Sequence, residues 1–218
     1  MPMELTTTFH ALKEWAVAIN ALESGNTIML LRKGGIHERN GHFQVGHKQI
    51  LLYPTYEHQQ AFMLKAEYAN NVYPVTSGWH PETVRIGSWA EITDILPCSD
   101  ESIVNTLLPF HIWNEHFISD RLKWKARQPL YILLLRTYKL PQEQEIPYYA
   151  KYAGCKSWID LDREIQLQTA QPVLSNFAYS QLVETIREIV GDKLYVCSIL
   201  LITQLVAQIP DFLKKSGI

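Results

Sequence analysis

Basic and aromatic side chains alternate between residues 110 and 139 of this chain. From residue 121 to residue 139 there are six basic residues and no acidic one: Arg121, Lys123, Lys125, Arg127, Arg136 and Lys139. Two tryptophans, Trp113 and Trp124, and two tyrosines accompany them. Cations pair with phosphates and aromatic rings stack on bases, so this pattern is typical of a nucleic-acid-binding surface. The alternative is that both tryptophans belong to the core and the lysines cover the exposed face of a helix.

A second group of polar and aromatic side chains follows two apolar runs between residues 28 and 59. The first run ends in Arg32 and Lys33, and the second leads to Tyr53, Tyr56, His58 and Gln59. Strand ends of this kind are where a scaffold builds a binding site. We therefore expect residues 28–59 and 110–136 to form two walls of one cleft.

The residue types suggest a role for each member of this cleft. Phosphate contacts are expected from Arg32, Lys33, Arg121, Lys123, Lys125 and Arg127. Trp113 or Tyr56 would be the stacking platform, and His58 or Gln59 would form a hydrogen bond with a base or sugar.

All eight histidines lie in the first 116 residues, which raises the question of a metal site. His42 and His47 are five residues apart, which puts them on opposite faces of a strand. The same interval separates His111 and His116, about 140° around a helix. There is no HExxH motif, so we expect hydrogen-bonded or solvated histidines and no metal or cofactor. The rival interpretation is a metal-dependent hydrolase or nuclease that uses His37, Glu38, His58 and His111.

The sequence lacks the common motifs of enzymes that use a serine or cysteine nucleophile. The chain lacks GxSxG, and Cys98, Cys155 and Cys197 are too scattered for a disulfide framework or a CxxC metal site. Cys155 precedes a lysine, which can lower a thiol pKa, but a small residue packed in a turn is the simpler explanation. The glycine pair at 34–35 fits neither GxGxxG nor GxxxxGK[ST] and indicates a tight turn. We expect a chain that is not an enzyme by itself.

Composition indicates a soluble globular protein with a packed core. The chain has 218 residues, of which 47% are hydrophobic and 19% charged. The net charge of −2 excludes a generally cationic nucleic-acid coat. Residues 1–109 carry 7 basic and 11 acidic groups and residues 110–218 carry 13 and 11, which leaves room for a local basic face. The scattered cysteines and the lack of a secretory signal favour a cytoplasmic location.

Hydrophobic periodicity and turn residues predict the elements of the N-terminal half. Thr8 caps a helix over residues 9–22, which stops before Gly25. Strands are expected at 27–31 and 49–53, with Pro54 ending the second one. A short helix at 57–65 is plausible, and residues 70–81 form a long loop.

The C-terminal half begins with a strand at 82–95 that has a bulge or bend at Gly87. Helices follow at 99–108 and from Asn114 to about residue 123, and residues 129–141 form a buried central strand. A helix ending at Gly191 and a final helix at 194–213 are expected. The apolar run 194–209 is shorter than the ~20 residues that a membrane span needs, so a buried or partner-facing helix is favoured.

These elements predict an α+β fold: a mixed, strongly curved sheet of five or six strands, flanked by helices, with a helical C-terminal section. Residues 1–175 would be the core domain, with residues 176–218 packed on it as a helical extension. The C-terminal helices offer a surface for an oligomer or a partner. The order of strand, helical insert and long strand resembles that of PUA-like barrels, which read modified or flipped bases.

Five sequence blocks in one order resemble a known bacterial family, domain of unknown function 1802. They are ALKEWAVAINALESGNTIMLLRKGGI, LLYPTYEHQ, HIWNEHF, PLYILLLRTYKLP and YAGCKSW, and the resemblance spans residues 9–175. It implies no activity. By association with restriction-endonuclease-like domains, it implies a role near DNA restriction or processing and a restriction-type nuclease as partner.

If the chain itself were a restriction-type nuclease, its sequence should contain the residues of the metal site of such enzymes. Such a site needs an acidic residue followed by an acid-x-Lys step around a metal-bound water. The chain contains no Asp-x-Lys or Glu-x-Lys, and residues 164–166 are only a loose variant. The catalytic half would then be another domain or protein. The leading hypothesis is a non-catalytic nucleic-acid recognition module; a scaffold acting through its C-terminal helices is a further alternative.

Overall fold

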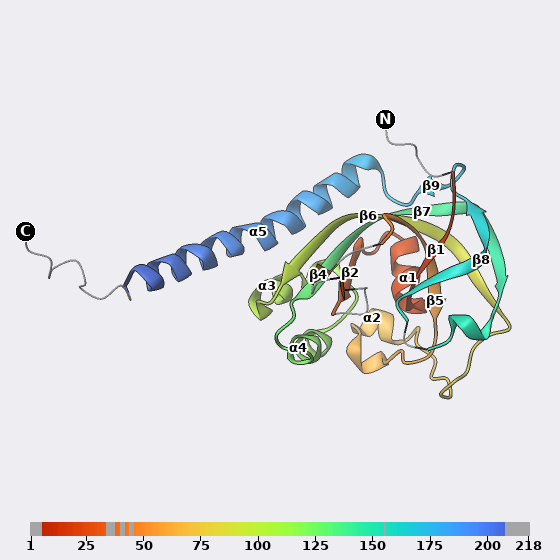
Figure 1. Ribbon diagram of the computed structural model, residues 1–218, viewed down its shortest axis with the longest axis horizontal. Coiled ribbons are helices and arrows are strands. Elements are labelled where there is room, and N and C mark those ends of the chain that lie inside the picture. Colours follow the sequence, from red (N-terminus) through yellow and green to blue (C-terminus); the bar gives the residue numbers. More distant parts are fainter. Residues whose placement is uncertain (1–5, 34–37, 40–41, 44–45, 155, 208–218) are drawn as a thin grey trace, which may run out of the picture.

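The computed structural model describes residues 6–33, 38–39, 42–43, 46–154 and 156–207. Its centre is a mixed sheet of seven strands, in the order β2-β7-β6-β5-β1-β8, with β9 also paired to β7. Figure 1 shows this sheet curving strongly, with helices around it. The strands are β1 (Thr7–Trp15), β2 (Met29–Arg32), β5 (Gln49–Thr55), β6 (Thr83–Cys98), β7 (Leu130–Pro147), β8 (Trp158–Gln166) and β9 (Gln171–Pro172). The predicted α+β fold is confirmed.

The remaining elements are short, with one exception. A separate two-stranded pair is formed by β3 (Glu38–Arg39) and β4 (His42–Phe43). The helices are α1 (Ala16–Glu23), α2 (Ala66–Ala69), α3 (Glu101–Thr106), α4 (Glu115–Lys123) and the long α5 (Asn176–Ala207). Single 3₁₀ turns are η1 (Ala61–Met63), η2 (Leu108–Phe110) and η3 (Ala150–Tyr152). The single helix predicted at 57–65 is wrong, because η1 and α2 take its place.

The helix predicted over residues 9–22 is half strand. β1 occupies the first part, and α1 begins only at Ala16. β1 pairs in parallel with β5 and antiparallel with β8, so both of its edges have a partner strand. Both of its faces are also covered in the middle of the strand, because the successive residues Ala11 and Leu12 are both 0% exposed. A strand that is buried on both faces does not need to alternate polar and apolar residues. The spacing of the apolar residues in β1 was therefore also compatible with the period of a helix.

The start of α1 depends on a distant residue. Trp15 provides no side-chain cap at the first turn of the helix. Instead, the backbone N–H of Val17 donates to Oε1 of Gln59, 3.0 Å away. This contact satisfies a donor that has no partner within the helix.

Proline 54 does not end β5, contrary to the prediction. β5 continues to Thr55, and Pro54 stays in register with Glu14 of β1. On its other side, β5 pairs with β6 only as far as Leu51. Beyond Leu51 that edge has no partner strand among the described residues, so a residue without an N–H is tolerated there.

Strands β6 and β7 pair along almost their whole lengths, from Thr83 opposite Pro147 to Cys98 opposite Leu130. The register shifts between Ile86 and Ser88, so the pairing is irregular at Gly87, where the sequence predicts a bulge or bend. The extra residues lie on β7, because Ile86 is opposite Gln144 and Ser88 is opposite Lys139. The central strand predicted at 129–141 is confirmed, and it extends six residues further, to Pro147.

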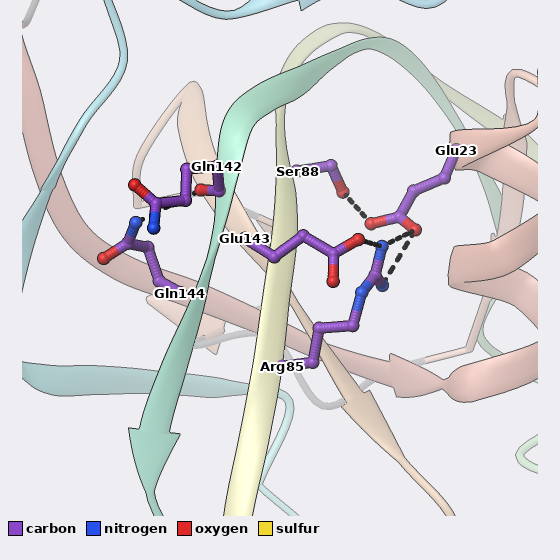
Figure 2. Close-up of polar contacts among 6 residues, drawn as sticks. All are labelled: Glu23, Arg85, Ser88, Gln142, Glu143 and Gln144. Carbon is purple, nitrogen blue, oxygen red and sulfur yellow. Dashed lines mark hydrogen bonds and ion pairs between the residues drawn. The ribbon is translucent and has the colours of Figure 1, made fainter.

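Polar contacts connect this part of β6 to α1, as Figure 2 shows, and two of the side chains involved, Glu23 and Ser88, are buried. Both terminal nitrogens of Arg85 donate to Oε2 of Glu23 at 3.0 Å, and Nη2 also donates to Oε1 of Glu143 at 2.6 Å. Ser88 donates to the other oxygen of Glu23 at 2.8 Å. A Cβ on Gly87 would lie 2.5 Å from Nη2 of Arg85. The glycine therefore leaves the space that the guanidinium occupies.

The helical insert between β6 and β7 begins each helix with a side-chain cap. Asp100 accepts from the N–H groups of Ser102 and Ile103 at the start of α3. Asn114 accepts from the N–H of Phe117 at the start of α4. The helix starts predicted near residue 99 and at Asn114 are confirmed, and the N-cap role predicted for Asn114 is confirmed as well.

Apolar residues bury both faces of the sheet in two clusters. Alternate residues of β5 separate between them: Ile50 and Leu52 belong to the larger cluster, and Leu51 and Tyr53 to the smaller one. The larger cluster includes α1, α3, α4 and part of α5. Tyr53 therefore lies on the face of the sheet opposite α1.

The C-terminal section is one helix, α5, and does not end at Gly191. The break predicted there is wrong, because a glycine inside a helix costs only about 1 kcal/mol. Tyr179, Val183, Ile186 and Val190 are buried in the larger cluster, and Figure 1 shows the helix then extending away from the sheet. None of the helices in the described residues has the length and apolarity to cross a membrane. The turn predicted at 34–35 and residues 208–213 lie outside the described residues.

Candidate nucleic-acid interface

A cleft of about 730 Å³ lies at the ends of β1, β2 and β5 and beside α4. This volume is within the range of sites that enclose small ligands. Six of the ten residues predicted as site residues line it: Arg32, Lys33, Tyr56, His58, Trp113 and Arg121. The structure thus brings together parts of segments 28–59 and 110–136, which are far apart in the sequence.

Strand pairing explains why these residues meet. β1 and β5 are parallel and adjacent, with Lys13 opposite Tyr53 and Trp15 opposite Thr55. The carboxyl ends of both strands therefore lie at the same edge of the sheet. The ring of Trp15 packs edge-on against Phe117 of α4, with centroids 6.3 Å apart, and this contact joins α4 to that edge.

Arg32 and Lys33 both have partners within the protein. Nη1 of Arg32 forms an ion pair with Oε2 of Glu14 at 2.5 Å, and the two side chains are 13% and 8% exposed. Nζ of Lys33 donates to the carbonyl of Leu122 at 2.8 Å, and burial lowers the pKa of this lysine. Lys33 thus links the end of β2 to the last turn of α4, where a cation is favourable.

Arg121 is a cation of a different kind. Its Cζ lies 4.9 Å from the ring centroid of Phe117 and 5.9 Å from that of Trp124. Within the described part of the chain it forms no ion pair. Burial is the main cause that lowers the pKa of Arg121; the charge of Glu14 raises this pKa, the charge of Arg32 lowers it and that of Asp120 raises it. An anion in the cleft would stabilise this half-desolvated guanidinium.

Aromatic rings form much of the cleft wall. Tyr56 meets Trp79 edge-to-face at 5.9 Å, and His80 stacks on Tyr148 at 3.5 Å. Trp79 is 45% exposed, whereas Trp113 is 2% exposed and belongs to the larger core cluster. Trp113 therefore belongs to the core, as the alternative interpretation of the sequence expected. Tyr56 and Trp79 present rings that are more accessible from the cleft.

Tyr53, which follows the second apolar run, also lines the cleft. The sequence prediction missed other lining residues, among them Lys13, Trp79, His80, Tyr148 and Lys156. Trp79 and His80 come from the long loop 70–81. Loops positioned by a rigid scaffold often carry binding residues, and this was the available signal. No local pattern pointed to the others, because β-strand pairing brings them to the cleft.

His58 and Gln59 have different surroundings. His58 is 66% exposed, and its Nε2 lies 3.5 Å from Oε1 of Glu57. Glu57 accepts from the N–H of Gly78 at 2.7 Å, and this hydrogen bond is the main cause that lowers its pKa. Gln59 does not line the cleft, since its amide oxygen caps α1.

Three of the predicted phosphate contacts, Lys123, Lys125 and Arg127, lie outside the cleft. All three are exposed where α4 ends and the chain leads into β7, and we call them the basic strip. Nζ of Lys125 lies 4.8 Å from the ring centroid of Trp124, whose other neighbour is Arg121. The basic strip thus continues from the cleft along the surface.

The histidines and acids do not gather into a metal site within the described residues. No group of three or more His, Cys, Asp or Glu there is placed to hold an ion. His58 lines the cleft, while His111 is 2% exposed and lies outside its lining. His37, and with it part of the rival hydrolase interpretation, falls outside the described residues, as does Cys155.

The chain is similar to the crystal structure of ASCH from Zymomonas mobilis, with a TM-score of 0.38 and 11% identity over 81% of this chain and 93% of that one. A mutant of that protein matches with a TM-score of 0.36 and 13% identity, over 81% of this chain and 96% of that one. None of the curated proteins matches the chain. A family model described as Domain of unknown function (DUF1802) matches residues 11–185, and the chain therefore belongs to that family.

Proposed function

We propose that this chain recognises nucleic acid through the cleft and the basic strip beside it. The observation that supports this most is Arg121, which is half-buried between two aromatic rings and has no ion-pair partner among the described residues. The cleft around it is lined by five lysines and arginines against two glutamates. Such a cleft favours an anionic ligand with a flat, stackable group.

The side chains divide the work of binding. Arg121 contacts a phosphate at the cleft, and Lys123, Lys125 and Arg127 contact phosphates along the adjoining surface. Tyr56 and Trp79 offer rings for stacking, and the exposed imidazole of His58 offers a hydrogen bond. Arg32 and Lys33 act indirectly, because they hold Glu14 and α4 in place.

Fluorescence titration of labelled single-stranded DNA, single-stranded RNA and duplex DNA at low salt tests this proposal. Arg121→Gln is expected to weaken binding about tenfold or more, since it removes a partly desolvated cation. Lys123→Glu with Lys125→Glu should weaken binding and reduce the slope of log K against log salt by about 1 or more. Lys48→Gln is the matched control, because Lys48 is exposed and does not line the cleft. Binding that is absent, or indifferent to Arg121 and the basic strip, contradicts the proposal.

We also propose that any cleavage step belongs to another protein or domain, with a restriction-type nuclease as the partner that the family resemblance implies. The chain has no acid-x-Lys step, and no metal-holding group of His, Cys, Asp or Glu occurs within the described ranges. Pull-down of such a nuclease on the tagged chain is the test. Metal-dependent cleavage of DNA by the purified chain alone would contradict the proposal.

A further inference from the structure

We propose that the cleft receives one unpaired nucleotide, with its phosphate at Arg121 and a polar edge of its base at the hydroxyl of Tyr53. This inference rests on the proposed function and makes it specific. It commits the cleft to a single nucleotide in single-stranded or extruded form, and excludes a base pair within a duplex.

The hydroxyl of Tyr53 is the first observation. Tyr53 lines the cleft, is 2% exposed, and its Oη has no hydrogen-bond partner among the described residues. Burial is the main cause that raises the pKa of this phenol, so the group stays protonated and able to donate. Buried hydroxyl groups in proteins normally have a partner, and a ligand atom is the partner that a cleft can supply.

A neighbouring tyrosine shows the contrast. The ring of Tyr152 packs edge-on against that of Tyr53, with centroids 5.9 Å apart. The hydroxyl of Tyr152, however, accepts from the backbone N–H of Asp162 at 3.0 Å. Tyr152 is therefore committed to holding β8, whereas Tyr53 keeps its hydrogen-bonding capacity for a ligand.

The cation is the second observation. The guanidinium of Arg121 has aromatic contacts to Phe117 and Trp124 and no ion pair in the described ranges. Arg32, whose charge lowers the pKa of Arg121, is paired with Glu14, whose charge raises it. A phosphate is a suitable ligand, because a guanidinium offers two parallel N–H donors to phosphate oxygens.

The aromatic rings that line the cleft together with Tyr53 and Arg121 favour a nucleotide over a bare anion as the ligand. The exposed ring of Trp79 with Tyr56, and the stacked pair of His80 and Tyr148, present flat faces around the cleft. Only an unpaired base offers a free ring face for stacking and a free polar edge for Tyr53 at the same time. The volume of about 730 Å³ suits a ligand of that size.

The test is calorimetric titration of the full chain with the four ribonucleoside 5′-monophosphates and, separately, with inorganic phosphate. At least one monophosphate should bind with a stoichiometry of one and tenfold or more tighter than phosphate. Tyr53→Phe should weaken that binding about fivefold to tenfold, which corresponds to one hydrogen bond. Arg121→Gln should weaken it about tenfold or more. The matched controls, Tyr149→Phe and Lys48→Gln, change exposed residues outside the cleft lining and should leave binding unchanged.

Several outcomes overturn the inference, and they differ from failure of the proposed function. Phosphate that binds as tightly as every monophosphate would indicate an anion site only. An unchanged affinity in Tyr53→Phe would remove the hydroxyl from the site. If oligonucleotides bind through Arg121 and no monophosphate competes with them, the proposed function stands and the single-nucleotide cleft does not. If neither class binds, both fall.

Discussion

Arg32 and Glu14 form an ion pair at the wall of the cleft, with 2.5 Å between Nη1 and Oε2. Glu14 also accepts from the backbone N–H of Trp15 at 2.8 Å, so both of its oxygens have a donor. This carboxylate is in direct contact with Arg32, whereas its charge acts on Arg121 from further away, and Arg121 has no ion-pair partner among the described residues. The distribution of charge in the cleft therefore depends on one buried glutamate.

Glu14→Gln should destabilise the fold, because it leaves Arg32 buried without its carboxylate. Removing one partner of a buried pair typically costs about 3–5 kcal/mol. Urea unfolding measures the change in the free energy of unfolding. Glu143→Gln is the control, since its carboxylate is 56% exposed and its ion pair should contribute less than about 1 kcal/mol. Equal losses of stability in the two variants would contradict the conclusion that the buried Arg32–Glu14 ion pair matters more for the fold than the exposed one.

The buried imidazole of His111 predicts acid sensitivity. Burial is the main cause that lowers the pKa of His111 to about 4, and Lys65 adds to the effect. In the unfolded chain the pKa is near 6.5, so the unfolded state binds more protons between pH 6.5 and pH 4. The stabilising contribution is therefore complete above pH 6.5 and falls by up to about 3 kcal/mol as the pH drops to 4.

His111→Gln should remove this part of the pH dependence. The measurement is the free energy of unfolding in urea at several pH values between 4 and 7. His116→Gln serves as the control, because the His116 side chain is 57% exposed. A wild-type pH profile in His111→Gln would show that other groups determine acid stability.

Gly87→Ala should destabilise the protein through Arg85. The new Cβ would lie 2.5 Å from Nη2 of Arg85 and 2.9 Å from Oε1 of Glu23, so the guanidinium must leave its position. We expect a loss of about 2 kcal/mol in the free energy of unfolding. A double-mutant cycle with Arg85→Ala checks the mechanism, because the cost of Gly87→Ala should then be much smaller. Strictly additive effects would place the cause elsewhere.

Gly191→Ala should stabilise α5. The glycine lies inside a continuous helix, and a Cβ there would meet nothing within 4 Å. Alanine is favoured over glycine in a helix interior by about 1 kcal/mol, so helical circular dichroism and the melting temperature should increase. A decrease would instead support a helix end at this glycine, because alanine is unfavourable in the left-handed conformation of a C-cap.

The parts of the fold that the sequence predicted depend on short-range chemistry. Asp100 and Asn114 cap helices by contacts two or three residues away, and the irregular pairing at Gly87 lies where a glycine interrupts strand alternation. The errors involve distant partners. Residues 7–15 are a strand because β5 and β8 flank them, and Pro54 stays in β5 because one edge is free of a partner there.

The site shows the same division. Arg121 and Tyr56 were recognisable because their residue types and neighbours already suggest binding. The hydroxyl of Tyr53 was not, because strand alternation gives its face and only the packed structure shows that it lacks a partner. Likewise, the sequence alone does not show that the ammonium group of Lys33 donates to the carbonyl of Leu122, 89 residues away.

The hydrogen bond from Lys33 to the carbonyl of Leu122 joins the end of β2 to α4 across 89 residues of sequence. It connects the two segments that line the cleft, and we expect it to limit how far they can separate. A rigid opening means that little conformational entropy is lost on binding, and affinity then depends on fit. The cleft would then select among ligands by how well they fit its existing shape, and closure around the ligand would contribute less.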